Sequence, residues 1–480
     1  MRNWISLAGA IIAIGSFFAF LLLFALDMFS EHGNPYMGIL AYLVAPGFLA
    51  AGFALAGLGA WIQFRKERLA HPEAPPVSLA IDLSRSRDRK ILAVFAAGGV
   101  IFLFMTALGS YQTYHYTESV SFCGQVCHTP MDPEFVTSRN SPHARVECVA
   151  CHVGSGATAY LKTKISGMRQ LYHVVRNDFE RPIHLIPGKL RPARETCEQC
   201  HWPQKFTGGF ERTFRHFLSD EKNTAFTVRL LLNVGGGDPH RGPVGGIHWH
   251  MNSADKIEYV AADEQQRVIP LVRHTDSKGA VTEYRNPEFK GDLSKFPIHT
   301  MDCLDCHNRP SHNLLAPNDA VDLSLASGRI DPQLPWVKSK VVSALVQPYA
   351  TVPEAMQKIE ESLKTAYPNE PKVAAVVTEA QAIYRSNFFP EMKSDWKSYP
   401  NHLSHKNWDG CFRCHDGKHV TAETKKSIKA TDCKSCHLIL AQGNNEQIGK
   451  MNAEGFDFFH IDAEYSDFSC TECHTGAAQK

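Results

Sequence analysis

The sequence predicts three N-terminal transmembrane α-helices followed by a larger domain of mostly loops and short helices, with a small antiparallel β insertion. Three observations predict this architecture. Apolar residues concentrate in three segments within the first 110 residues. All 14 cysteines fall into closely spaced pairs beyond these segments. Between the third and fourth pairs lie short runs of β-branched or alternating residues, broken by Gly-rich turns, which are typical of strands.

The three apolar segments cover 4–26, 37–62 and 91–110. Each is about as long as the roughly 20 apolar residues that a helix needs to cross a bilayer. The first segment could also be a cleaved signal peptide. It is followed by Asp27 and Glu31 and lacks a small-x-small cleavage site, so we expect an uncleaved anchor.

The loops between the apolar segments predict the orientation in the membrane. The first loop carries Asp27 and Glu31 and no Lys or Arg. The second loop and its borders carry seven basic residues: Arg65, Lys66, Arg68, Arg85, Arg87, Arg89 and Lys90. Because basic loops stay in the cytoplasm, the N-terminus is expected inside and everything after 110 outside. In a bacterium this places the large domain in the periplasm, on the inner membrane.

Every cysteine pair is followed directly by a histidine. Six pairs read C-x-x-C-H: Cys148/Cys151/His152, Cys197/Cys200/His201, Cys303/Cys306/His307, Cys411/Cys414/His415, Cys433/Cys436/His437 and Cys470/Cys473/His474. The first pair, Cys123/Cys127/His128, has one extra residue between its cysteines. A disulfide framework needs no trailing histidine, and zinc ribbons use two such pairs per metal.

Covalent haem attachment explains this spacing. Two thiols form thioethers to the haem vinyl groups, and the next residue then lies beneath the iron, where an imidazole binds it. We therefore expect a multihaem c-type cytochrome domain with seven covalently bound haems, numbered here in chain order. The formal net charge of +1 gives no basic field for nucleic acid, so no nucleic-acid partner is expected.

The spacing of the motifs divides the rest of the chain. The gap between haems 3 and 4 carries the predicted strands, at 227–233, 256–261, 267–273 and 280–285. The gap between haems 4 and 5 shows helical apolar spacing at 319–326, 352–366 and 372–387. The predicted parts are a membrane anchor (1–110), a haem 1–3 region (111–202), a β-rich insertion (203–298) and a haem 4–7 region with a helical insertion (299–480).

The region from 111 to 202 resembles the NapC/NirT family of membrane-anchored quinol dehydrogenases. A membrane helix runs into Cys123–His128, with Met131 close behind, and Asn140-Ser141-Pro142-His143 precedes Cys148. Further matching positions follow the second motif: Val153, Tyr160, Lys162, Lys164, Gly167 and Tyr172. That family usually has four haems and one helix. Three helices with seven haems instead resemble the longer inner-membrane cytochromes of metal-reducing bacteria (the ImcH type).

The resemblance implies particular axial ligands. Met131 matches a family position that ligates haem 1, where a thioether raises the potential, and this leaves the role of His128 in doubt. His143 and His299 resemble positions that ligate another haem in trans. Lys164, or its neighbour Lys162, resembles the haem-ligating lysine of the family.

Other ligands are expected from position in the chain. The six histidines of the C-x-x-C-H motifs are the expected proximal ligands: His152, His201, His307, His415, His437 and His474. Histidines just before or after an attachment site can reach a neighbouring iron, and these are His312, His419, His402, His405 and His460. His248 and His250 would share a face in a strand, and we expect one of them, His250 being the candidate, to be a ligand.

A quinol site is expected near haem 1. The family places an acidic residue within the helix after the second motif, but here Gln170 stands at that position, beside Arg169. Gln170 can hydrogen-bond a quinol hydroxyl without taking its proton, which leaves Asp178 or Glu180 as candidate bases. Lys164 and His115, at the membrane exit, complete the candidate set.

The resemblance implies an inner-membrane quinol dehydrogenase, a quinol:cytochrome c oxidoreductase of anaerobic respiration. Menaquinol from the membrane pool would be the substrate, soluble periplasmic multihaem cytochromes the partners, and an extracellular oxidant such as a metal oxide the final acceptor. Two alternatives stay open. The chain could be an electron conduit serving a separate membrane subunit or a periplasmic nitrate/nitrite-type reductase, or a terminal reductase with one open haem site.

Overall fold

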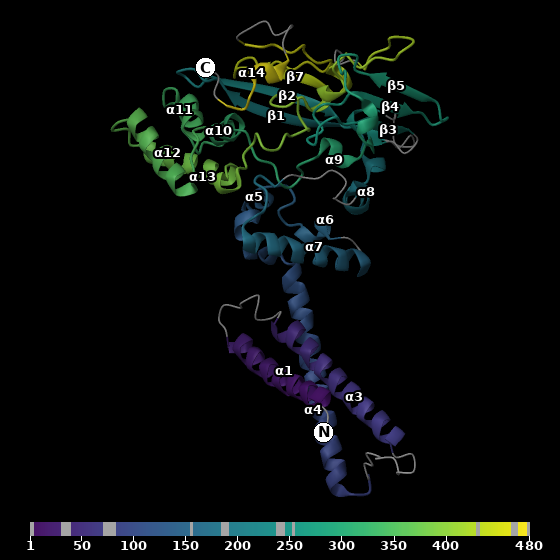
Figure 1. The fold of residues 1–480 in the computed structure, drawn as a ribbon. Helices are drawn as coiled ribbons and strands as arrows, with labels where there is room; N and C mark the ends of the chain where they lie inside the picture. Colours follow the sequence, from purple (N-terminus) through teal and green to yellow (C-terminus); the bar gives the residue numbers. More distant parts are fainter. Residues whose placement is uncertain are drawn as a thin grey trace. The chain divides into compact units, whose positions relative to one another are not determined.

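The computed structural model describes residues 4–29, 40–70, 83–153, 157–183, 192–236, 245–251, 255–428, 433–461 and 469–477. The chain forms two compact units, Met1–Cys127 and His128–Lys480 (Figure 1). The four-part division expected from the motif spacing stays a prediction.

Three long helices make up the first unit: α1 (Trp4–Phe29), α3 (Ala45–Ala70) and α4 (Ser86–Glu118). They contain three stretches long and apolar enough to cross a membrane, Trp4–Leu26, Leu40–Glu67 and Ser86–Glu118. The prediction of three apolar N-terminal helices is therefore confirmed. α4 is longer than expected, because it continues past the apolar segment to a point just before the first cysteine motif.

Small residues let α1 and α3 approach closely. A Cβ atom added to Gly9 would lie 2.3 Å from the backbone nitrogen of Ala56, and one added to Gly52 would lie 2.6 Å from that of Ala13. The Ser6 hydroxyl also donates a hydrogen bond to the Ala56 carbonyl, at 3.2 Å. Close backbone contact through small residues is how helices pack in lipid, where apolar burial alone gives little preference for association.

The second unit contains two antiparallel sheets. The first has the order β1-β2-β7, formed by β1 (Gly209–Phe217), β2 (Ala225–Asn233) and β7 (His437–Gly443). The second has the order β5-β4-β3-β6, formed by β3 (Lys256–Val260), β4 (Leu271–Thr275), β5 (Val281–Arg285) and β6 (Ile298–Thr300). Inward side chains of the second sheet, including Ile257, Tyr259 and Val272, form its own buried cluster.

The sheets differ in part from the sequence prediction. Strands were predicted where β2, β3, β4 and β5 lie, although β4 begins later than expected. Strands β1, β6 and β7 were not predicted. β7 comes from the C-terminal motif region, and its Leu438 pairs with Leu231 of β2. The first sheet is therefore not a self-contained insertion, because one of its three strands follows the sixth motif.

The main apolar core of the second unit lies among four helices: α10 (Pro317–Ala326), α11 (Val337–Leu345), α12 (Val352–Ala366) and α13 (Val373–Asn387), grouped together in Figure 1. Val321, Val341, Ile359 and Leu363 are fully buried there. α12 begins with Thr351, whose hydroxyl accepts a hydrogen bond from the Glu354 amide at 3.3 Å, an N-cap typical of helix starts. The three helices predicted in this gap are present, and α11 is an additional one.

The remaining elements before β1 are short helices. They include α5 (His128–Arg139), α6 (Cys148–His152), α7 (Ala157–Arg176) and α8 (Ala193–Thr196). Only α7 is longer than four turns. This agrees with the expectation that the motif regions are mostly loops and short helices.

Candidate haem sites: cysteine motifs and paired histidines

One short helical turn forms each C-x-x-C-H motif that the structure describes in full. Examples are α6, η3 (Cys197–Gln199), α9 (Cys303–Cys306), η8 (Gly410–Arg413) and α14 (Cys470–Cys473). The His201 amide donates to the Cys197 carbonyl, and the His307 amide to the Cys303 carbonyl, each at 2.8 Å. Positions i, i+3 and i+4 of a helical turn lie on one side, so two thiols and one imidazole converge there.

Cys200 and Cys436, the second cysteines of the third and sixth motifs, lie just outside the helical turn of their motif. The 3₁₀ helices η3 and η9 (Cys433–Ser435) each end one residue before them. Cys200 is exposed, and its amide donates to the Cys197 carbonyl at 3.1 Å. Cys436 is half-buried, and its carbonyl accepts a hydrogen bond from the Asn233 amide of β2 at 2.8 Å. Neither Cys200 nor Cys436 forms a disulfide. Haem attachment at both, and at the other motif cysteines, stays a prediction.

The first motif uses a wider turn. Cys123 lies in η2 (Phe122–Val126), a single π-helical turn, and Cys127 directly follows this turn. A π turn closes between residues i and i+5 rather than i and i+4. The extra residue between Cys123 and Cys127 is therefore absorbed by the wider turn, which supports counting this motif with the others. The side chain of His128 lies outside the described residues.

None of the thirteen described cysteine side chains forms a disulfide. The side chain of Cys433 is outside the described set. Two attachment sites adjoin, because the Cys303 thiol donates a hydrogen bond to Cys197 and lowers the pKa of Cys197 to about 6. The guanidinium of Arg413 in the fifth motif donates to the Asp305 carbonyl of the fourth at 2.7 Å. The fourth motif thus contacts both the third motif and the fifth.

Each of the six C-x-x-C-H histidines faces a second histidine from elsewhere in the second unit. The distances between ring centres are 6.0 Å for His143–His201, 6.2 Å for His152–His312, 6.3 Å for His248–His307, 5.8 Å for His250–His415, 6.3 Å for His405–His437 and 6.0 Å for His460–His474.

These distances fit one metal ion between each pair of rings. An imidazole nitrogen lies about 1.1 Å from its ring centre and binds a metal at about 2 Å, so two imidazoles on opposite sides of one ion place their ring centres about 6.2 Å apart. All six distances lie close to this value. Each pair includes the histidine of a motif that has two cysteines in the sequence, so the residues present fit a covalently bound haem whose iron would have two imidazole ligands.

The second ring nitrogen of several partner histidines is already engaged. Nδ1 of His248 donates to the Val234 carbonyl at 3.0 Å, and Nδ1 of His250 to the Ile247 carbonyl at 2.9 Å. Nδ1 of His143 lies 3.3 Å from the Pro310 carbonyl. Such bonds fix the tautomer and leave Nε2 free for a metal. Burial lowers the pKa of His405, His437 and His474, which favours the neutral imidazole that binds metal.

His312 has the most polar surroundings of the partner histidines. Its Nδ1 lies 2.9 Å from a carboxylate oxygen of Glu134 on α5, and Arg309 approaches the same carboxylate at 3.5 Å. Burial opposes ionisation of Glu134, but the charges and hydrogen bonds of Arg309 and His312 outweigh it and lower the pKa of Glu134 to about 2. Glu134 is therefore a carboxylate at physiological pH.

Comparison with known proteins shows the family to which the chain belongs. Residues 85–193 match the N-terminal region of the NapC/NirT cytochrome c family. The cytochrome c-type protein ImcH of Geobacter sulfurreducens is 39% identical over 493 residues, which cover 99% of this chain and 96% of the relative. The chain belongs to the NapC/NirT cytochrome c family. The resemblance seen in the motifs of the sequence is thus confirmed, and this is an ImcH-like multihaem cytochrome c. No solved structure matches it.

Two histidines of this cytochrome lie on a different kind of element from the one that the sequence predicted. His248 and His250 are on η5 (Ile247–Met251), a 3₁₀ helix rather than a strand. With three residues per turn, positions two apart point in different directions instead of sharing a face. His248 accordingly faces His307 and His250 faces His415, so both of them contact a motif histidine. Their roles as ligands stay predictions.

Three sequence candidates lie elsewhere in the cytochrome. His419 is fully buried, and its two ring nitrogens meet Asp416 at 2.8 Å and the Ile269 carbonyl at 2.6 Å, which leaves no nitrogen for iron. His402 is buried with Nε2 3.0 Å from the Gln265 carbonyl. His299, on β6, stacks on Tyr259 at 5.4 Å. Within the described residues, no ring contact joins any of the three to a motif histidine.

The candidates for haem 1 and for quinol lie on three helices. Met131 is half-buried on α5, while Lys164, Arg169 and Gln170 lie on α7. His115 lies on α4, where its ring contacts Tyr111 at 4.4 Å. Of the two candidate bases after α7, Asp178 accepts a hydrogen bond from His173 at 2.8 Å, and Glu180 is exposed. The roles of all these residues remain predictions.

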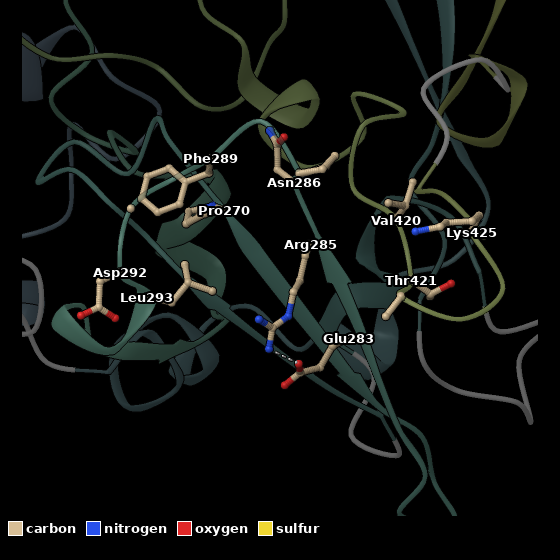
Figure 2. Close-up of a pocket in the computed structure, with 13 residues that line it drawn as sticks. Pro270, Glu283, Arg285, Asn286, Phe289, Asp292, Leu293, Val420, Thr421 and Lys425 are labelled. Carbon is tan, nitrogen blue, oxygen red and sulfur yellow. Dashed lines mark hydrogen bonds and ion pairs between the residues drawn. The ribbon is translucent and has the colours of Figure 1, made fainter.

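A separate hollow of about 730 Å³ lies beside the second sheet (Figure 2). Arg285 and Glu283 point toward each other there, and an Arg285 nitrogen donates to a Glu283 oxygen at 2.9 Å. Other lining residues include Pro270, Asn286, Phe289, Asp292, Val420 and Lys425. The lining contains neither cysteine nor histidine, so this hollow is not one of the candidate haem sites of the cytochrome.

Proposed function

We propose that this cytochrome is an inner-membrane menaquinol dehydrogenase that passes electrons through seven c-type haems to periplasmic cytochromes. The observation that carries the proposal is the set of six histidine pairs, each beside a cysteine motif and each at the spacing that one iron requires. Haem bound at these motifs would supply centres that each take up and release one electron.

The pairs support a particular set of axial ligands for haems 2 to 7. In chain order, the second ligands are His312, His143, His248, His250, His405 and His460, opposite His152, His201, His307, His415, His437 and His474. A histidine on both sides of an iron leaves no position for a substrate. These six sites therefore suit electron transfer and not reduction of a small oxyanion.

Haem 1 is the proposed entry point for electrons. Met131 is its proposed axial ligand, and Lys164, Arg169, Gln170 and His115 are the proposed quinol-site residues. Oxidation of menaquinol releases two electrons and two protons, and Asp178 or Glu180 is the proposed first acceptor of a proton. The basic loop between the second and third apolar segments supports an orientation in which this chemistry occurs on the periplasmic side.

The contacts among the motifs support onward transfer. The third, fourth and fifth motifs adjoin through Cys197, Cys303 and Arg413, and His248 and His250 place ligands for two successive haems on one short helix. Soluble multihaem cytochromes are the proposed direct electron acceptors. An extracellular oxidant such as a metal oxide is the proposed final electron acceptor.

The test uses purified full-length protein in lipid nanodiscs. Haem-bound iron is first counted against protein, with seven per chain expected. A menaquinol analogue is then added anaerobically while the haem absorption bands are recorded. Reduction of the haems is expected. A full haem complement with no reduction would contradict the quinol activity and leave the chain as a conduit for another subunit.

A further inference from the structure

Helix α7 turns its apolar side chains away from the second unit. The most exposed apolar residues recur at three- and four-residue intervals and therefore lie on one side: Ile165 (54% exposed), Met168 (66%), Leu171 (44%), Tyr172 (56%) and Val175 (78%). We call these five residues the α7 apolar face. Thr163, Gly167 and Val174, on the opposite side of the helix, are partly buried. An amphipathic helix of a water-soluble domain has the reverse arrangement.

The charges of α7 are all positive. The helix contains no Asp or Glu between Ala157 and Arg176. Lys162, Arg169 and Arg176 are exposed and lie seven residues apart, so they form one row along the border of the α7 apolar face, next to Ile165 and Tyr172. Arg176 also lies over the Tyr172 ring at 5.4 Å and donates to its hydroxyl at 2.7 Å.

Apolar residues flanked by Arg, Lys and Tyr match the chemistry of a membrane surface. The apolar side chains can insert at the boundary between headgroups and acyl chains. The row of basic side chains can bind the phosphates of anionic lipids. The chain itself supplies a bilayer for this contact, because its first unit has three helices that can span one.

We propose that α7 lies in the headgroup region of the bilayer, with the α7 apolar face toward the acyl chains and Lys162, Arg169 and Arg176 on the phosphates of anionic phospholipids. Arg169 is also one of the proposed quinol-site residues, but the lipid contact does not depend on quinol oxidation. It would hold even if another subunit oxidised the quinol.

The test uses the full-length, haem-loaded protein in nanodiscs that contain a phospholipid with a photoactivatable diazirine below its headgroup. Half of the discs are phosphatidylcholine alone, and half also contain phosphatidylglycerol. After illumination, lipid adducts are located by peptide mass spectrometry. We expect adducts on 161–176 in both lipids, with more in the anionic discs.

The chain offers a matched comparison segment. Residues 451–461 also expose apolar side chains, including Phe456 (39%), Phe459 (54%) and Ile461 (37%), but they lie beside the acidic residues Glu454 and Asp457. An adduct yield on α7 no higher than on 451–461 would overturn the proposal. That result would mean that a haem or another protein covers the α7 apolar face instead.

A charge variant tests the cationic row. The double change Arg169→Gln/Arg176→Gln is expected to lower the α7 adduct yield in anionic discs by about an order of magnitude, since each basic residue near an anionic surface is worth about fivefold. The yield in phosphatidylcholine discs should change little. Lys358→Gln/Lys364→Gln on α12 removes equal charge elsewhere and should have no effect. An equal loss of α7 adduct yield in both double variants would contradict lipid binding by the row of basic residues on α7.

Discussion

Nδ1 of the His312 imidazole lies 2.9 Å from a carboxylate oxygen of Glu134, and it donates a hydrogen bond to the Glu134 backbone carbonyl at 3.1 Å. Glu134 lies on α5, whereas His312 follows the fourth cysteine motif and faces His152 of the second motif. A carboxylate behind a ligating imidazole increases the basicity of that ligand and stabilises the more positive oxidation state of the metal. Nδ1 of His143, His248 and His250 lies close to a backbone carbonyl instead.

We therefore expect Glu134→Gln to raise the midpoint potential of haem 2. The expected rise is about 60 mV, which corresponds to a tenfold change in a one-electron equilibrium. A spectroelectrochemical titration of the purified protein measures it. Glu360→Gln, which removes an exposed carboxylate on α12, is the control and should leave all potentials unchanged. A titration curve of Glu134→Gln that superimposes on the wild type would contradict the assigned role of His312.

A pair of histidines three residues apart tests the ligand assignment. His405 faces His437, whereas His402 hydrogen-bonds to the Gln265 carbonyl. His405→Met should raise one haem potential by about 100 mV or more, because a thioether ligand favours reduced iron. His402→Met should alter stability but no potential. Electron paramagnetic resonance of the oxidised proteins reports the ligand change directly, and a new signal from His402→Met instead would reverse the assignment.

Met131 is the proposed axial ligand of haem 1, and Met131→His should lower the potential of that haem. A redox titration measures this change, and we expect the step at the highest potential to disappear in the variant. Met392→Leu is the control, because Met392 is buried among Leu314 and Phe389 and lies in no motif. If the potentials and spectrum of Met131→His match those of the wild type, another residue ligates haem 1.

A buried ion pair joins the helical core to the first sheet. Lys338 Nζ lies 2.7 Å from Asp322, both side chains are less than a tenth exposed, and Asp322 also accepts hydrogen bonds from His216 and the Phe217 amide. Asp322→Asn leaves the Lys338 charge buried without its partner, so we expect a loss of about 3–5 kcal/mol in the opening free energy of α10 and α11. Hydrogen exchange of those helices measures this quantity.

The exposed pair Lys372–Asp331 provides the control for that measurement. Its side chains are 52% and 31% exposed, so Asp331→Asn should cost less than about 1 kcal/mol. The double variant Lys338→Met/Asp322→Leu should regain part of the stability lost in Asp322→Asn. Equal losses from the buried and exposed pairs would show that Asp322 contributes no more than a surface charge.

The sequence predicted the structural features that depend on residues close together in the chain. One helical turn fixes the geometry of C-x-x-C-H, so the motifs and their proximal histidines follow from spacing alone. Apolar composition likewise predicted three membrane-spanning helices, and 3.6-residue periodicity predicted α10, α12 and α13. In each case neighbouring residues carry the information.

The partner histidines depend on contacts between distant segments, and there the sequence was less informative. His419 follows its motif much as His312 does, but the nearby Asp416 and the Ile269 carbonyl occupy both of its nitrogens. The alternation of His248 and His250 predicted a strand, whereas a 3₁₀ turn points the two rings in different directions. β7 could not be foreseen as a partner of β2, because pairing across some two hundred residues leaves no local pattern.

The histidine pairs also constrain the order in which the protein matures. His312 follows the fourth motif but faces the histidine of the second, while His143 precedes the second motif and faces the histidine of the third. During synthesis, the histidine of the second motif must remain without its partner until His312, beyond the fourth motif, has been made. The histidine pair at the second motif therefore forms only after a large part of the second unit has been made.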